Sequence, residues 1–175
     1  WVQDGTGAWN GVLLYQGGGF SGYNIGDAVT VYGEVEEYNN TTEITGTTVT
    51  VTGTGTVPAP IVLTTLAAND EQYEGCLIEV QNVTFMSITS SHPSQSPWEV
   101  DDGSGLLEGW SYFYNSITYA PEVNDTHAYI RGVVDYYNSR YEIIPRNDAD
   151  FSDFTPPPIP TTNPIGLGLL LAGLS

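Results

Sequence analysis

The chain has 175 residues, and its 21 acidic residues against only three basic ones, all Arg, give a formal net charge of −18. Proteins that bind nucleic acids or anionic membranes draw affinity from Lys and Arg, so this charge argues against both kinds of partner. The hydrophobic content of 40% is still enough for a folded core. In chain order, the first strong pattern is the alternation of residues 28–36, which predicts a strand, and residues 47–54 predict another. A short helix is predicted near residues 67–73 and a further strand over residues 75–85. The chain is therefore predicted to be mostly β.

An internal repeat with an offset of 98 to 99 residues runs through these strands. In each copy, a short strand leads into a Gly-rich turn, and a later strand with a central Gly ends in Tyr-Asn and is followed by Glu-Ile. The matching segments are Trp1–Gly7 with Glu99–Gly105, Val31–Asn39 with Ile130–Asn138, and Glu43-Ile44 with Glu142-Ile143. Two copies of one β module are the economical interpretation.

The order of these motifs resembles the OB-fold modules attached to secreted bacterial and archaeal nucleases. The resemblance covers residues 1 to about 154 and implies two tandem five-stranded Greek-key barrels. The catalytic nuclease domain of those larger proteins has no counterpart in this sequence. The predicted division is module 1 over residues 1–57, a linker over 58–72, module 2 over 73–154, a Pro-rich arm over 155–164 and an apolar tail over 165–175.

The two modules differ at their start. In module 2, residues 75–85 supply a first strand, whereas nothing precedes Trp1 in module 1. A barrel without its first strand has an open edge, which we expect Trp1 and Val2 to border. Because the first residue is not Met, either a leader has been removed or the sequence is a fragment, and the native chain could also start further upstream.

The apolar tail is a candidate for the absent strand. Five prolines make the arm stiff and extended. Beyond it, Ile165, Leu167, Leu169 and Leu171 share one face of a strand, which favours donation into module 1 of a neighbouring copy. Two alternatives stay open, namely the start of a membrane anchor or sorting signal, for which 11 residues are too short to span a bilayer, and a disordered tail.

Little in the sequence points to catalysis. The two histidines, His92 and His127, lie outside metal-binding and hydrolytic patterns, and His127 is expected ahead of a strand and partly exposed. The single cysteine, Cys76, allows no intrachain disulfide and reads as a buried hydrophobic residue. An enzyme is therefore the least favoured class.

A cation site is the one ligand site that the acids suggest. Asp101 and Asp102 adjoin a Gly turn, and Asp4 holds the matching place in module 1. Calcium is the cofactor they would hold, although the same residues also form turns by bonding their own backbone. The other acids are expected on outward positions, as a solvated coat.

Four Asn-x-Ser/Thr sequons favour an exported, glycosylated protein. They begin at Asn39, Asn40, Asn82 and Asn124. Together these features predict a non-enzymatic extracellular subunit that polymerises head to tail into a filament or sheath, with copies of itself as partner. The alternative is an accessory OB-fold module that binds polysaccharide or nucleic acid.

Overall fold

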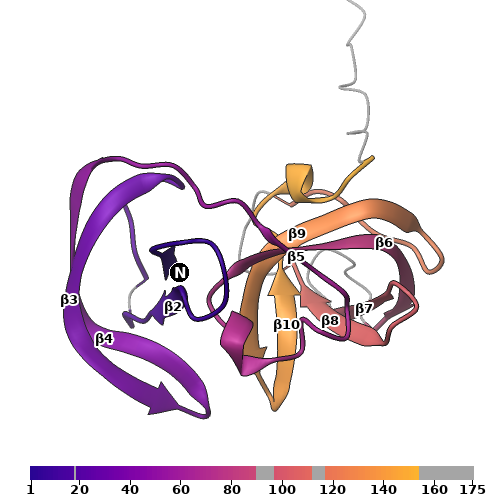
Figure 1. Cartoon of the computed structure of the whole chain (residues 1–175), viewed down its shortest axis with the longest axis horizontal. Coiled ribbons are helices and arrows are strands. Elements are labelled where there is room, and N and C mark those ends of the chain that lie inside the picture. The colour runs from indigo at the N-terminus through magenta and orange to yellow at the C-terminus, as the bar shows by residue number, and fades with distance from the viewer. Residues whose placement is uncertain (18, 90–96, 112–116, 154–175) are drawn as a thin grey trace, which may run out of the picture.

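The structure is a computed structural model that describes residues 1–17, 19–89, 97–111 and 117–153 (Figure 1). With 54% of the residues in strands and 4% in helix, it confirms the all-β prediction. In these described ranges, no helix is long and apolar enough to cross a membrane. The predicted Pro-rich arm, the apolar tail and His92 lie outside the described residues.

The amino-terminal part is a four-stranded sheet, which we call the open sheet. Its order is β1-β2-β4-β3, with β2 and β4 parallel and the other neighbours antiparallel. Figure 1 shows β3 and β4 as one long curled ribbon, with β2 and the amino terminus on its inner side. The strands are β1 (Val2–Gln3), β2 (Gly11–Leu14), β3 (Asp27–Tyr38) and β4 (Thr41–Thr54).

The carboxy-terminal part contains a closed five-stranded barrel, in the order β6-β7-β8-β10-β9, which β6 closes by pairing with β9. The β8–β10 pair is parallel and the other pairs of the barrel are antiparallel. The strands are β6 (Leu77–Ile88), β7 (Pro97–Asp101), β8 (Leu106–Trp110), β9 (Thr126–Tyr137) and β10 (Arg140–Ile144).

Three short elements complete the description. Strand β5 (Ile61–Leu63) lies in the predicted linker and pairs in parallel with the first half of β6. A 3-10 helix follows at Glu71–Tyr73, inside the segment for which a short helix is predicted, and a second one lies at Asp148–Asp150. Asp70 caps the first of these helices by accepting a hydrogen bond from the Gln72 amide.

The hydrophobic core belongs to the barrel. Trp98 is fully buried against Phe85, and its ring leaves no room for a side chain at Gly109, where a Cβ would lie 2.1 Å from ring carbons. The Trp98 indole N–H donates to the Ser111 hydroxyl at 3.0 Å, which gives this buried polar group a hydrogen-bond partner. The other large hydrophobic side chains that are fully buried in the described residues are Ile78, Val80, Val83, Val100, Leu107, Ile130, Val134, Ile143 and Ile144.

The sequence repeat reappears in the strand register. Residues 99 positions apart have matching partners, since Val35 lies opposite Ile44 in the open sheet and Val134 lies opposite Ile143 in the barrel. Each central glycine sits where its strand crosses its neighbour closely: a Cβ at Gly33 would lie 2.6 Å from the Thr45 carbonyl oxygen, and one at Gly132 would lie 2.6 Å from that of Ile144. The open sheet is therefore built like four of the five strands of the barrel.

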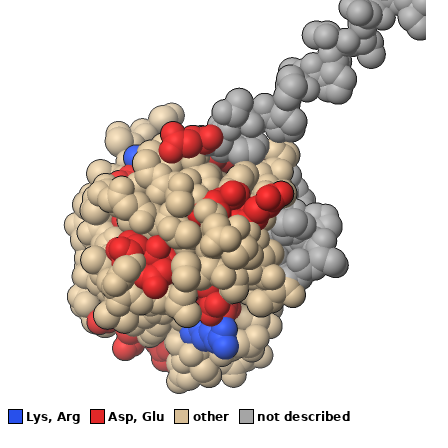
Figure 2. Space-filling model, turned by 90° about the vertical axis from the view of Figure 1, so that its right-hand side faces the viewer, with Lys and Arg blue, Asp and Glu red and all other residues tan. Residues whose placement is uncertain are grey.

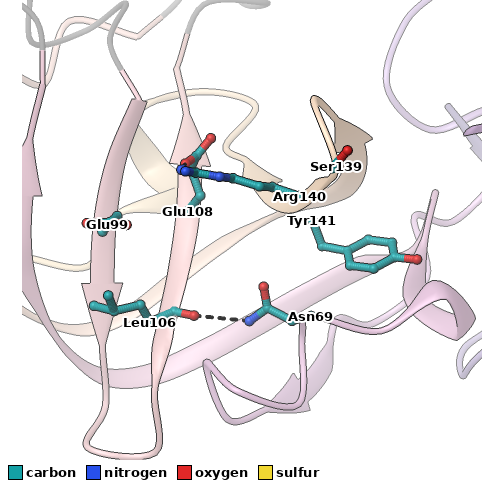
Figure 3. Close-up of a pocket in the computed structure, with 7 residues that line it drawn as sticks. All are labelled: Asn69, Glu99, Leu106, Glu108, Ser139, Arg140 and Tyr141. Atoms are coloured by element: carbon teal, nitrogen blue, oxygen red, sulfur yellow. Dashed lines mark hydrogen bonds and ion pairs between the residues drawn. The ribbon is translucent and has the colours of Figure 1, made fainter. Parts of the chain in front are cut away.

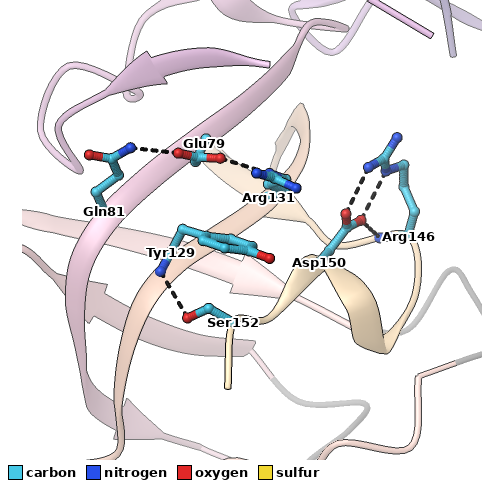
Figure 4. A network of polar contacts seen from close by, with 7 residues as sticks. All are labelled: Glu79, Gln81, Tyr129, Arg131, Arg146, Asp150 and Ser152. Carbon is cyan, nitrogen blue, oxygen red and sulfur yellow. Dashed lines mark hydrogen bonds and ion pairs between the residues drawn. The ribbon is translucent and has the colours of Figure 1, made fainter. Parts of the chain in front are cut away.

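The last described residues are clasped to β9. Phe151 forms an isolated antiparallel bridge to Ile130, and the Ser152 amide donates to the Tyr129 carbonyl at 3.0 Å. In return, the Tyr129 amide donates to the Ser152 hydroxyl at 2.9 Å (Figure 4). We call this pairing the carboxy-terminal clasp.

His127 belongs to the same region and corrects a prediction. It lies within β9, not ahead of it, and it is buried. Phe85, Tyr119 and Phe151 pack around the ring, while its two nitrogens contact the Tyr119 hydroxyl and the Ser152 carbonyl oxygen. These contacts stabilise His127 in the interior, whereas the polarity of the residue predicts a position near the surface.

Candidate functional site

The candidate site is the gap between β1 and β3, the two outer strands of the open sheet. In the barrel, β6 pairs with both β7 and β9, which correspond to β1 and β3. Within the described residues, β1 pairs only with β2, and β3 pairs only with β4. The open sheet therefore presents two strand edges where the barrel has a strand between them.

Side-chain burial shows the consequence of this gap. Val134 is 0% exposed because β6 and the core cover it, whereas Val35, at the equivalent position, is 72% exposed. Among the described residues of 1–57, only Thr41 and Glu43 are buried, so this part has no buried hydrophobic side chain. Of the sixteen exposed large hydrophobic residues in the described part of the chain, ten lie in this amino-terminal third. Contiguous apolar surface is typical of interaction sites, which makes this part of the chain the candidate site.

Strand β6 shows what a strand in such a position does. Ile78 lies opposite Gly132, Val80 lies opposite Ile130, and both side chains are fully buried. On the outer side, Glu79 pairs with Arg131 across the two strands at 2.7 Å, as Figure 4 shows. The Arg131 guanidinium also lies 4.2 Å from the centre of the Tyr129 ring, which adds a cation–π contact.

A group of buried acids lies where the open sheet meets the barrel. Glu74 accepts a hydrogen bond from the Thr42 amide at 2.8 Å, while its second oxygen and one oxygen of Asp135 are buried without a hydrogen-bond partner among the described residues. Burial raises the pKa of Glu74 to about 7, that of Asp135 to about 6 and that of Glu142 to about 8, and their mutual repulsion adds to the rise for Glu74 and Glu142. The amino group of Trp1 faces Asp135 and offsets part of this effect.

These acids correct the expectation of a solvated coat. The buried ones are Glu43, Glu74, Glu79, Asp135, Glu142 and Asp150. Two of them are paired with arginines, Glu79 with Arg131 and Asp150 with Arg146, which repays part of the cost of burying a charge. Alternation in the sequence missed Glu79, Asp135 and Glu142 because they lie in stretches of barrel strand where successive residues are buried on both faces. On the face of the molecule shown in Figure 2, acidic side chains form several separate patches and basic ones occupy a small area.

Of the three predicted cation ligands, Asp4 and Asp102 lie in turns and Asp101 is the last residue of β7. Asp4 belongs to the open sheet and the other two to the barrel. The Asp101 carboxylate accepts hydrogen bonds from the Gly103 and Gly105 amides, and that of Asp102 accepts from Thr65 and Ser104. These bonds hold the pKa of Asp102 below its usual value against the opposing effect of burial. In residues 1–17, 19–89, 97–111 and 117–153, no three His, Cys, Asp or Glu side chains are placed to hold a metal ion.

The predicted residues of the edge and the sequons are arranged as follows. Trp1 and Val2 are partly buried at the β1 edge, and Cys76 is fully buried. All four sequon asparagines are exposed and have a positive φ. Asn39 and Asn40 form the β3–β4 turn, Asn82 lies within β6, and Asn124 precedes β9.

A shallow cleft of about 310 Å³ lies on the outer side of the barrel (Figure 3). Glu99, Glu108 and Tyr141 line it, and Arg140 is paired there with Glu108. At its rim, the Asn69 side chain donates to the Leu106 carbonyl at 3.1 Å. The cleft gathers polar groups and one aromatic ring, but its lining has no pairing of a nucleophile with a base.

Comparison with known proteins adds no relative from which a function could be transferred. Neither the models of known protein families nor the curated proteins give a match to this chain. The assignment of function therefore rests on the geometry of the open sheet.

Proposed function

We propose that the protein is a non-enzymatic extracellular subunit that polymerises head to tail, with the open sheet of one copy accepting a strand from the next. The observation that carries the proposal is the exposure of Val35 at a position where the closed barrel buries Val134 completely. An added strand would cover that side chain and bond to both free edges, which is how β-strand addition gains affinity.

The proposal includes the finer fold assignment. The barrel order β6-β7-β8-β10-β9, in which β8 and β10 form a parallel pair, supports an OB-like Greek-key barrel. The open sheet would be a second such module without its first strand. The resemblance to modules of secreted nucleases implies two such barrels in tandem, and the absent first strand departs from that pattern.

The strand that we propose as donor is the tail of another copy. The chain continues for 22 residues beyond Asp153, and its final segment 165–175 is apolar and uncharged. The ten residues of the Pro-rich arm can span about 31 Å at 3.1 Å per residue, enough to reach a neighbouring subunit. A donor and an acceptor at different places on one chain form a heterologous contact, which repeats into a filament when it does not close.

Deletion of residues 165–175 tests the proposal. The full chain should sediment as polymer and show filaments in electron micrographs, whereas the shortened chain should stay monomeric. A matched control replaces Val62, an exposed residue of β5 away from the gap, with Ser and should assemble normally. Normal filaments from the shortened chain would refute the proposal.

One observation favours the alternative, a binding module. The cleft beside Tyr141 combines an aromatic ring with polar side chains, which suits a sugar better than a nucleic acid because two acids line it. Titration of soluble oligosaccharides and of single-stranded DNA into the tail-deleted chain would test this, with Tyr141→Ala as the variant that should lose binding. A chain that binds neither ligand would exclude the alternative.

A further inference from the structure

Strand β6 defines a side-chain pattern that any strand filling the gap should share. Over residues 75–84, four inward side chains, those of Cys76, Ile78, Val80 and Val83, are 0% exposed. Two backbone positions are left-handed, at Gly75 with φ 73° and at Asn82 with φ 53°. The second of these lies between the buried Val80 and Val83, so that the inward positions are spaced two, two and then three apart, while the pairing with β9 continues without a register shift.

The tail repeats this pattern at a constant offset of 91 residues. Residues 166–175 carry leucine at every position that matches an inward residue of β6, and glycine at both positions that match a left-handed one. Glycine is the residue that adopts this backbone conformation without strain. The correspondences are Gly166 to Gly75, Leu167 to Cys76, Leu169 to Ile78, Leu171 to Val80, Gly173 to Asn82 and Leu174 to Val83.

Neighbouring registers fail this comparison. A shift of two residues in one direction places Leu171 at the left-handed position, where a side chain is strained. The opposite shift matches Gly173 with Val80 and leaves an inward position without a side chain. A shift of one residue would turn the apolar face outward. Only the offset of 91 satisfies both the apolar and the left-handed positions.

The outward side chains agree with the same register. In the barrel, Glu79 is opposite Arg131, and the two form an ion pair. The equivalent residue of β3 is Tyr32, which is 70% exposed, and the equivalent residue of the tail is Leu170. The charged pair of the barrel thus has an apolar pair as its counterpart, as expected if the two side chains meet.

We propose that the tail of one copy pairs antiparallel with β3 of the next, with Leu169 opposite Gly33, Leu170 opposite Tyr32 and Leu171 opposite Val31. This inference rests on the proposed function and specifies the partner of the open sheet residue by residue. It also changes which side chains face inward: Leu174 joins Leu167, Leu169 and Leu171, while Ile165 takes the place of Glu74 at the entry to the gap.

Cysteine cross-linking between two preparations tests the register. Opposed residues in an antiparallel pair have Cα atoms about 4.5–5.5 Å apart, within the range of a disulfide. A Tyr32→Cys chain mixed with a Leu170→Cys chain should form a disulfide dimer on mild oxidation. Because each preparation carries one partner, the dimer proves that the contact joins two copies. The native Cys76 is buried and present in every sample, including the unsubstituted control.

Two matched variants test the neighbouring registers of the tail. Gly168→Cys and Ala172→Cys, each mixed with Tyr32→Cys, would cross-link only in registers shifted by two residues. If one of them forms the dimer in place of Leu170→Cys, the register is wrong and strand donation stands. If the samples sediment as polymer and none cross-links, the tail does not occupy the gap and the register is overturned. Monomers in every sample of full-length chain would instead refute the proposed function.

A backbone variant gives an independent reading. Gly173→Val should weaken assembly about tenfold, because a β-branched residue at a left-handed position is strained by an amount of that order. Gly168→Val is the control, since the matching Leu77 has an ordinary backbone and already carries a side chain. Equal assembly of the two variants would contradict the register.

Discussion

The paired valines offer a direct test of the open sheet, because one substitution can be made at two equivalent positions. Val134→Ala removes two methyl groups from a fully buried site, which should lower the free energy of unfolding by about 2 kcal/mol from lost transfer energy and the remaining cavity. Val35→Ala removes the same groups from a side chain that is 72% exposed, so its effect on the monomer should stay within about 0.5 kcal/mol.

Assembly should respond differently to the second substitution. If an incoming strand buries Val35, the loss of two methyl groups costs about 1.6 kcal/mol of association energy, or roughly fifteenfold in the dissociation constant. Urea denaturation of the tail-deleted chain measures the first effect, and the critical concentration for sedimentation of the full chain measures the second. Equal destabilisation of the tail-deleted chain by both variants would show that Val35 is already covered in the monomer. Unchanged assembly with Val35→Ala would show that the strand docks elsewhere.

Three further predictions concern the junction, the barrel and the gap. The folded-state pKa values of Glu74, Asp135 and Glu142 are raised to about 7, 6 and 8. The stability that these carboxyl groups contribute is therefore complete below about pH 4 and is lost as the pH rises through 6 to 8. At constant ionic strength, thermal unfolding should occur at a lower temperature at pH 9 than at pH 5. Glu142→Gln should reduce this difference, and an unaltered difference would contradict the assignment. Gly132→Ala should destabilise the barrel by about 1–3 kcal/mol in urea, since its Cβ would lie 2.6 Å from the Ile144 carbonyl, and an unchanged midpoint would refute the close approach. A synthetic peptide with the sequence of residues 75–84 should bind the tail-deleted chain in calorimetry and a scrambled peptide should not, whereas equal heats for both would argue against a β6-like site.

The repeat made a large part of the architecture predictable. The constant offset of the repeat predicts the strand register, because it preserves which residues are opposite one another and which face of the sheet each side chain is on. The matches that show this are Val31–Asn39 with Ile130–Asn138 and Glu43 with Glu142. The strand predicted over residues 75–85 was found as β6, bonded on both sides. Local patterns and turn glycines were sufficient for these elements.

Other features depend on contacts that no local pattern encodes. Strand β5 has only three residues and exists because β6 offers it an edge, so its sequence alone predicts a linker. Glu74 and Asp135 look like surface acids in the sequence and become buried where the open sheet meets the barrel. His127 is drawn inward by three aromatic rings contributed by distant segments. In each case a tertiary neighbour decides the environment.

The carboxy-terminal clasp has a mechanical consequence. Any pull on the chain beyond Asp153 reaches the barrel first through Phe151 and Ser152, which are held to β9 by a few backbone and side-chain hydrogen bonds. Such a short antiparallel attachment opens bond by bond, whereas the closed barrel behind it must break several ladders together. If the tail joins subunits as proposed, the clasp would yield under tension before the barrel and lengthen the connection, which would make it an extensible link that leaves the barrel folded.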